Sequence, residues 1–252
     1  MQDIKYSVII TITIMRAWAS MDINQKIVSK LASLGFACDE NQAELLGIYL
    51  NFLVEYNKNV NLTAITEENE IIVKHFADSL GALKDIPYGA RHVDIGSGAG
   101  FPAVVLKIFR PDLDVTMVES NGKKVLFLEK LIEKLGLKGI RAVKLRAEEV
   151  ARSNDREGFD SFTARAVTEL NKLAEYGLPL IKTGGLMFAY KGKSEEELQN
   201  AQKAIKLLGG KVKENRVYTL ENQSRSLIII EKTGKTPDIY PRHNKKIISN
   251  PL

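Results

Sequence analysis

Apolar residues in the first part of the chain recur every three or four positions. Ile23, Ile27, Leu31 and Leu34 have this spacing before Gly35, and two longer stretches repeat it. Such periodicity is typical of amphipathic helices, and glycine is a common helix stop. The pattern predicts a helical region over residues 21–90 that packs as a cap on the rest of the chain, with helices near 23–34, 41–56 and 68–83.

From Arg91 onward, short apolar runs alternate with helical patterns. The runs predict strands near residues 92–95, 115–118, 140–145, 161–164 and 185–190, and the segments between them predict helices near 102–109, 122–135, 148–152 and 169–181. Regular alternation implies a parallel sheet with helices on both faces. A polar helix near 194–208 precedes two runs, 212–220 and 226–232, that predict a closing hairpin.

These elements predict an α/β protein with a mostly parallel seven-stranded sheet over residues 91–252. Five parallel strands followed by a hairpin match the class I, Rossmann-like methyltransferase fold. A dinucleotide dehydrogenase matches less well, because its second half repeats its first half.

The first twenty residues differ in character from the rest of the chain. Residues 7–15 form an apolar run and Ala17–Ala19 resembles a signal-peptide cleavage site, but the run is short, contains Ser and Thr, and is followed by Arg16. It is also too short to span a bilayer. We therefore expect residues 1–20 to be an extension outside the fold, Met21 to be the natural start, and the protein to be cytoplasmic without membrane association.

Composition narrows the class of protein. The chain has 252 residues, of which 44% are hydrophobic and 27% charged, which excludes a disordered or fibrous protein. A single cysteine and three histidines offer no disulfide and no Cys/His metal cluster, so we expect no metal and a reducing compartment.

Positive charge increases toward the C-terminus. The net charge is +5, yet residues 1–90 carry 7 basic and 11 acidic side chains, whereas residues 191–252 carry 13 basic and 7 acidic ones. This gradient suits contact with a phosphate backbone, although lysine-rich helix surfaces also serve solubility. Charge alone leaves a nucleic-acid partner open.

A glycine-rich turn joins the first predicted strand to the next helix. Residues 93–102 read VDIGSGAGFP, so Gly96, Gly98 and Gly100 fall within five positions. Glycines permit unusual backbone torsions and let a ligand approach the main chain. A dinucleotide fingerprint, G-x-G-x-x-G, would place its third glycine where Phe101 stands.

Carboxylates near this turn favour S-adenosylmethionine over NAD. Asp94 precedes the first glycine by two residues and would oppose a diphosphate, but it suits a sulfonium or ammonium group. Glu119 ends the second predicted strand, where a carboxylate can accept both ribose hydroxyls. Ala147 and Glu148 follow the third strand and are expected to flank the adenine. An NAD-dependent oxidoreductase remains the alternative.

The group to be methylated is indicated by motifs that the chain lacks. Cys38 lies outside the expected catalytic loops, which disfavours cytosine C5 chemistry. The Asp/Asn-Pro-Pro-aromatic tetrapeptide of exocyclic-amine methyltransferases is replaced by residues 163–166, Thr-Ala-Arg-Ala. A ring nitrogen such as guanine N7 needs no proton removed, so we predict no general base, and His75 fits a hydrogen-bonded core histidine better than a catalytic one.

Several basic residues are candidates for binding the substrate. Arg165 follows the fourth strand at the edge where ligands bind, which also makes it a cofactor candidate. Lys123 and Lys124 begin a helix and fit either a phosphate contact or a solvated helix face. The expected substrate-binding set is Lys123, Lys124, Arg165, Lys191 and Arg242.

Several motifs along the chain form a recognisable set. They are residues 61–65, His75 with Asp78–Ser79, the VDIGSGAGFP stretch, Lys123–Lys124 with Phe127–Leu128, Arg146–Glu148, Thr163–Ala166, Leu180–Gly185 leading to Lys191–Gly192, and Tyr240–Arg242 with Pro251–Leu252. Through these motifs the chain, from Met21 to Leu252, closely resembles the bacterial small-subunit ribosomal RNA guanine-N7 methyltransferases, also called glucose-inhibited division protein B. It departs from them at Ala103, where the family often has glycine, and in residues 1–20, which have no counterpart.

The resemblance implies an S-adenosylmethionine-dependent enzyme that forms 7-methylguanosine in 16S rRNA. The matching cofactor positions are Gly96, Phe101, Ala147, Glu148 and Arg165. The expected partner is 16S rRNA, free or in the small ribosomal subunit, and the enzyme is expected to be a monomer. An RNA-binding assembly factor that keeps the fold without turnover is a further interpretation.

Overall fold

The computed structural model describes residues 22–192 and 194–252, so the expected extension and the start at Met21 lie outside the described residues. Two helices, α2 (Ile23–Ser33) and α3 (Glu40–Asn57), begin the fold. Asp22 and Asp39 cap them by accepting hydrogen bonds from main-chain N–H groups of the first turn.

The third predicted helix is divided into three segments. It begins as α4 (Glu68–Ile71), widens into a π-helical stretch (Ile72–Ala77) and ends in a 3-10 turn (Leu80–Ala82). The guanidinium of Arg165 donates hydrogen bonds to the Lys74 and His75 carbonyls within the π-helical stretch. Such widened turns are frequent at functional sites.

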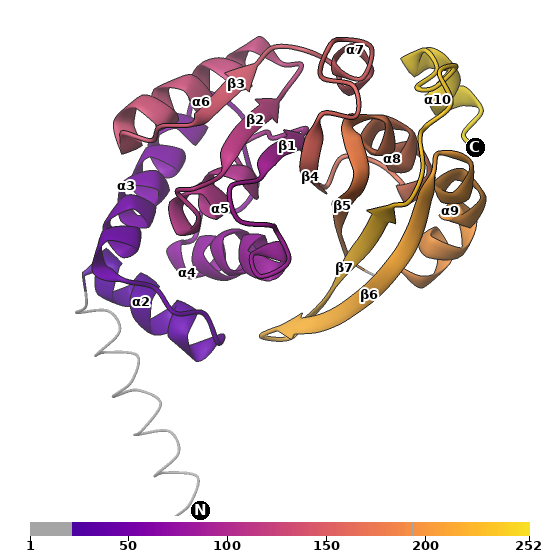
Figure 1. Cartoon of the computed structure of the whole chain (residues 1–252). Coiled ribbons are helices and arrows are strands. Elements are labelled where there is room, and N and C mark those ends of the chain that lie inside the picture. Colours follow the sequence, from indigo (N-terminus) through magenta and orange to yellow (C-terminus); the bar gives the residue numbers. More distant parts are fainter. Residues whose placement is uncertain (1–21, 193) are drawn as a thin grey trace, which may run out of the picture.

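Seven strands form one sheet in the order β3-β2-β1-β4-β5-β7-β6 (Figure 1). The first five are parallel, while β7 runs antiparallel to β5 and β6 antiparallel to β7. This confirms the mostly parallel seven-stranded α/β fold, and the chain order reverses between β1 and β4, where ligands bind in open sheets. The strands are β1 (Arg91–Ile95), β2 (Asp114–Val118), β3 (Ile140–Val143), β4 (Phe159–Arg165), β5 (Ile181–Lys191), β6 (Gly210–Leu220) and β7 (Gln223–Lys232).

Alternate residues of the strands face opposite layers of helices. In β5, Phe188 and Tyr190 join the core on the side of α5 (Ala103–Phe109) and α6 (Gly122–Leu135), whereas Met187 and Ala189 join the core on the other side. This alternation is the two-residue period of a strand. The second layer contains α7 (Ala147–Val150), α8 (Leu170–Gly177), a 3-10 turn (Leu178–Leu180) and α9 (Glu195–Leu207).

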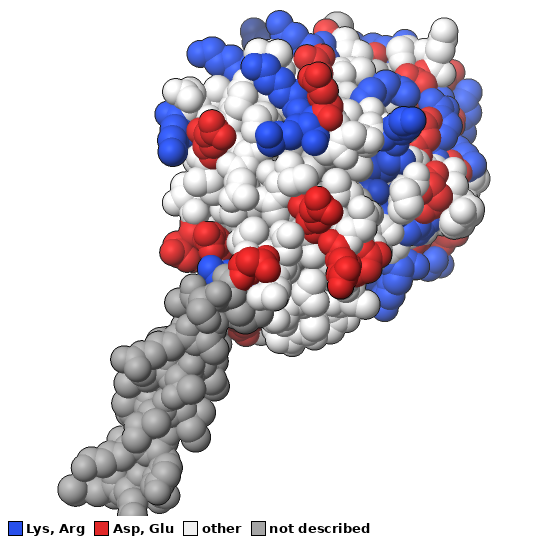
Figure 2. Space-filling model, turned by 90° about the vertical axis from the view of Figure 1, so that its left-hand side faces the viewer, with Lys and Arg blue, Asp and Glu red and all other residues white. Residues whose placement is uncertain are grey.

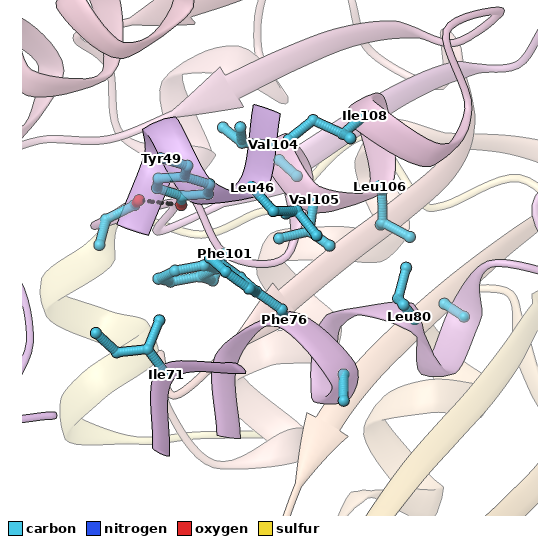
Figure 3. Packing of buried hydrophobic residues seen from close by; sticks show 14 of the residues in the cluster. Leu46, Tyr49, Ile71, Phe76, Leu80, Phe101, Val104, Val105, Leu106 and Ile108 are labelled. Carbon is cyan, nitrogen blue, oxygen red and sulfur yellow. Dashed lines mark hydrogen bonds between the residues drawn. The ribbon is translucent and has the colours of Figure 1, made fainter. Parts of the chain in front are cut away.

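The N-terminal helices pack against the helices that cover one face of the sheet. Leu46 of α3, Phe76 of the π-helical stretch and Val105 of α5 belong to one buried cluster (Figure 3). Phe127 of α6 belongs to the same cluster. Complete burial of side chains of this size contributes about 1.5–3 kcal/mol each. The change of pattern near residue 91 therefore does not divide the hydrophobic core.

A short C-terminal helix, α10 (Asn244–Ser249), was not expected from the sequence. Its segment is polar apart from two isoleucines, of which Ile247 is fully buried against the second layer. Within residues 22–192 and 194–252, no helix combines the length and the apolar character needed to cross a membrane.

Candidate functional site

The glycine-rich turn leaves β1 at the reversal of strand order. Gly96, Gly98 and Gly100 have φ values of 69°, 55° and 95°, in the left-handed region that glycine adopts most easily. A Cβ atom on Gly96 would lie 2.7 Å from Cγ2 of Val167, and one on Gly100 would lie 2.8 Å from the Tyr49 hydroxyl. The turn therefore requires glycine both for its torsions and for its close contacts.

Two aromatic side chains support the turn from the side of α3. Tyr49 is fully buried and donates a hydrogen bond of 2.5 Å to the Ala99 carbonyl (Figure 3). Phe101 stacks between Tyr49 and His75, at ring-centroid distances of 5.1 Å and 4.5 Å. The N-terminal helices thus hold the turn in place, a function that the sequence pattern did not reveal.

Glu119 reaches back from the end of β2 to the same turn. One carboxylate oxygen accepts a hydrogen bond from Gly98 N at 3.0 Å, and the other accepts one from Asn121 N at 2.8 Å. A carboxylate offers about four lone pairs, so two hydroxyl groups can still donate to it. The predicted ribose acceptor is therefore already oriented beside the glycines.

A cavity of about 240 Å³ lies next to the turn, and we call it the turn cavity. It brings together four residues that the sequence singled out as cofactor-binding: Gly96, Glu119, Ala147 and Glu148. Its wall also includes residues that the sequence did not suggest, namely Ile95, Val118, Ser120, Leu145, Arg146, Val167, Thr168, Tyr176, Asn244 and Ile248.

Asp94 lies behind the turn and lines neither this cavity nor its neighbour. It is fully buried; Oδ1 accepts a hydrogen bond from the Thr163 hydroxyl at 2.7 Å, and Oδ2 has no partner among the described residues. Burial raises the pKa of Asp94 to about 7, against the lowering effect of the hydrogen bond from Thr163 and of the positive charge of Arg165. The direct ligand contact expected of Asp94 remains a prediction.

A buried chain of hydrogen bonds leads to Asp94. Because the Thr163 hydroxyl donates to Asp94, it accepts from Nε2–H of His92 at 2.9 Å, and Nδ1 of His92 then accepts from the Ser161 hydroxyl at 2.8 Å. Burial lowers the pKa of His92 to about 3. The imidazole is therefore neutral and joins β1 to β4.

A second cavity, of about 500 Å³, lies beside His75, and we call it the His75 cavity. Arg165 lines it, with Nη1 3.0 Å from Asp78 Oδ2, Nη2 3.1 Å from His75 Nδ1, and the guanidinium carbon 5.1 Å from the centre of the Phe101 ring. The Arg165 side chain thus connects β4 to the π-helical stretch and to the glycine turn. It lines the His75 cavity and not the turn cavity.

His75 is hydrogen-bonded through both ring nitrogens, as expected. Arginine has only donors, so Nδ1 of His75 accepts from Arg165, and Nε2–H donates to the Thr63 hydroxyl at 2.9 Å. Burial, assisted by the positive charge of Arg165, lowers the pKa of His75 to about 3. His75 is a neutral wall residue whose nitrogens are both engaged.

The remaining basic candidates are Lys191, the pair Lys123 and Lys124, and Arg242, and each has different surroundings. Lys191 lines the His75 cavity, donates to the Thr168 carbonyl at 2.6 Å and pairs with Glu197. Lys123 is exposed and Lys124 partly buried at the start of α6, and neither lines a described cavity.

Arg242 has a structural position in the described chain. Its guanidinium pairs with the fully buried Glu175 at 2.6 Å and donates to the Asn250 carbonyl at 3.0 Å. These contacts attach the C-terminal segment to α8. Arg242 therefore anchors this segment, and its expected contact with RNA stays a prediction.

Basic side chains also gather on the outer surface. Figure 2 shows them along the upper part and the right-hand side of one face, with acidic side chains lower on that face. Helix α6, which Figure 1 places in the upper part of the fold, contributes the lysines Lys123, Lys124, Lys130 and Lys134. This charge distribution suits contact with a polyanion.

The loop after β4 separates the two cavities and belongs to both. Val167 and Thr168 line the turn cavity and the His75 cavity alike. Ala166 precedes them with a φ of 57°, an unusual conformation for a residue with a Cβ atom. Two ligands bound in these cavities would therefore meet at this loop.

Comparison with known proteins identifies relatives over most of the chain. A family model described as rRNA small subunit methyltransferase G matches residues 42–228. The ribosomal RNA small subunit methyltransferase G of Lactobacillus acidophilus is 44% identical over 229 residues, which cover 86% of this chain and 94% of that protein. Its counterpart in Alkaliphilus metalliredigens is 45% identical over 215 residues, covering 83% and 90%.

Solved structures share the fold at low sequence identity. A SAM-dependent methyltransferase from Aquifex aeolicus has a TM-score of 0.51 at 18% identity and covers 64% of this chain and 93% of that one. The Bacillus subtilis M1A22 tRNA methyltransferase TrmK has a TM-score of 0.52 at 15% identity, with coverages of 65% and 68%. These likenesses concern the fold alone, whereas the sequence matches are decisive and overturn the oxidoreductase alternative: the chain belongs to the rRNA small subunit methyltransferase G family.

Proposed function

We propose that the protein uses S-adenosylmethionine to methylate N7 of a guanine in 16S ribosomal RNA. The observation that carries this proposal is the pair of adjoining cavities, one beside the glycine turn and Glu119, the other beside His75, with Val167 and Thr168 common to both. Family membership supports a small-subunit rRNA substrate. The choice of N7 rests on the resemblance of the motifs and on the missing amine-docking tetrapeptide.

The turn cavity fits the cofactor in its chemistry. The Glu119 carboxylate has free lone pairs for ribose hydroxyls, and Leu145, Ala147 and Ile248 offer apolar surface to a base. In its ionised form, the buried carboxyl group of Asp94 behind the turn favours a positively charged group over a diphosphate. When bound, S-adenosylmethionine supplies a methyl group on a positively charged sulfur.

The His75 cavity fits the acceptor base. N7 of guanine already carries a lone pair, so the site needs placement in line with the donor rather than a proton acceptor. His75 agrees with this, because it is neutral and both of its nitrogens are engaged. Arg165 fixes the wall between base and turn by its contacts to Asp78 and Phe101. Lys191 lies in the same cavity wall, where its ammonium group pairs with Glu197, and it stays our candidate for a contact with RNA phosphate.

The test is transfer of labelled methyl groups to rRNA from cells that lack this protein. Purified protein is incubated with labelled S-adenosylmethionine and either free 16S rRNA or small subunits, and 7-methylguanosine is mapped by borohydride/aniline cleavage. We expect label at a guanine N7 in one of these substrates. Label confined to another atom, or no label in either substrate, would reject the proposal.

A pair of glutamate variants connects this activity to the turn cavity. Glu119→Gln removes the charge that orients the ribose, and we expect methyl transfer to fall about 10- to 100-fold. Glu129→Gln makes the same chemical change on the exposed face of α6 and should leave transfer unchanged. Equal activity of the two variants would place the cofactor elsewhere.

A further inference from the structure

Helix α10 is held firmly against the turn cavity. Ile247 is fully buried, Arg242 pairs with Glu175, and the Tyr176 hydroxyl of α8 donates to Oδ1 of Asn244. Both Tyr176 and Asn244 line the cavity. The helix thus occupies a defined position at the cavity wall, although it lies beyond residues 42–228, the part that matches the family model.

Exposed apolar side chains are concentrated at this cavity. Among the described residues, eight large apolar side chains are exposed, and three of them, Leu145, Val167 and Ile248, line the turn cavity. Ile248 of α10 is the most open of the three, at 58% exposure. Exposed apolar side chains around a small concave site are expected where a flat apolar ligand is to be covered.

The polar groups beside these side chains match the edge of adenine. The Glu148 carboxylate is largely buried in the wall and makes no hydrogen bond to another described residue, so it can accept from an exocyclic amine. Because Oδ1 of Asn244 accepts from Tyr176, its NH₂ group is left as a donor for a ring nitrogen. Adenine carries an amine donor next to a nitrogen acceptor, whereas hypoxanthine replaces this pair with a carbonyl and an N–H.

We propose that α10 completes the adenine subsite, with Ile248 covering the base and Asn244 donating to a ring nitrogen. This inference rests on the proposed use of S-adenosylmethionine. It assigns specificity for the cofactor to α10, a helix that the sequence pattern did not predict. Arg242 contributes indirectly, because its ion pair with Glu175 anchors the segment.

Binding of S-adenosylhomocysteine to the full-length protein, measured by calorimetry, tests the subsite without requiring turnover. Asn244→Asp keeps the oxygen that accepts from Tyr176 but loses the donor, and Asn250→Asp adds the same charge at an exposed position at the end of α10. Ile248→Ser is paired with Ile239→Ser, which changes a residue that is 74% exposed and lines neither cavity.

We expect Asn244→Asp and Ile248→Ser to weaken binding about 5- to 20-fold, and both controls to bind as the wild type does. Asn244→Asp should also reduce the preference for S-adenosylhomocysteine over its inosine analogue. Wild-type affinity and preference in both α10 variants would overturn the subsite while leaving the proposed function intact. Failure of the wild type to bind S-adenosylhomocysteine would overturn the proposed function and the subsite together.

Discussion

Replacing Tyr49 by phenylalanine isolates the support that α3 gives to the glycine turn. The Tyr49 ring contacts Phe76 and Phe101, and its hydroxyl makes the 2.5 Å hydrogen bond to the Ala99 carbonyl. Burial raises the pKa of Tyr49 well above its ordinary value, so the hydroxyl remains a donor throughout the neutral range. The variant keeps the ring and removes this donor only.

In the variant, the buried carbonyl of Ala99 loses its hydrogen-bond donor, and the expected effect is the loss of stability that such an unpaired group causes. Such a group costs about 1–3 kcal/mol, so we expect Tyr49→Phe to lower the free energy of unfolding by about 2 kcal/mol. For a chain of this length, that loss corresponds to a fall of about 4–8 °C in Tm. Affinity for S-adenosylhomocysteine should fall as well, because Ala99 lies within the turn.

Urea unfolding followed by far-UV circular dichroism measures the loss. Tyr88→Phe is the matched control, since Tyr88 is 88% exposed and its hydroxyl makes no buried contact. The control should stay within about 0.5 kcal/mol of the wild type. If the two variants have the same free energy of unfolding, the Tyr49 hydroxyl does not stabilise the turn and the reasoning is refuted.

Three further changes test other parts of the fold by urea unfolding. Arg242→Met leaves the buried Glu175 without its cation and should lower the free energy of unfolding by about 3–5 kcal/mol. Adding Glu175→Gln removes the unpaired charge, so the double variant should regain part of this loss, and a double variant no more stable than Arg242→Met would contradict the assignment. Because the pKa of His92 is about 3 in the folded protein and higher when unfolded, its stabilising contribution is complete above pH 6.5 and is lost as the pH falls toward 3. His92→Phe should therefore reduce the acid slope of stability by up to about 1.4 kcal/mol per pH unit, and an unchanged slope would refute the assignment. Ala166→Gly should stabilise by about 0.5–1 kcal/mol by relieving the positive φ, while Ala189→Gly in β5 should destabilise; a loss in both would argue against strain at residue 166.

The sheet was predictable because its strands are buried on both faces. Such strands appear as short continuous apolar runs, and the runs at 92–95 and 115–118 predicted β1 and β2 to within one residue at each end. The carboxyl ends of parallel strands share one edge, so residues that follow different strands meet there. This rule is why Gly96, Glu119 and Glu148 were correctly predicted to lie together.

The features that the sequence did not reveal depend on distant contacts. The π-helical stretch is stabilised by Arg165, some 90 residues away along the chain, and the local pattern indicated an ordinary helix. Helix α10 buries Ile247 alone and so lacks the periodicity that identifies a helix. Sequence patterns also do not show that Leu46 of the N-terminal helical region and Phe127 share one core.

Val167 and Thr168, in the loop that separates the two cavities, limit how such an enzyme can change in evolution. Val167 and Thr168 both line both cavities, so the proposed function predicts that a substitution at either position alters KM for the methyl donor and for the RNA at once. Substitutions at Ile248 or Lys191 touch one cavity only and can adjust one affinity while sparing the other. Adaptation to a new RNA should therefore begin at residues that line one cavity, such as Lys191, and reach Val167 and Thr168 last.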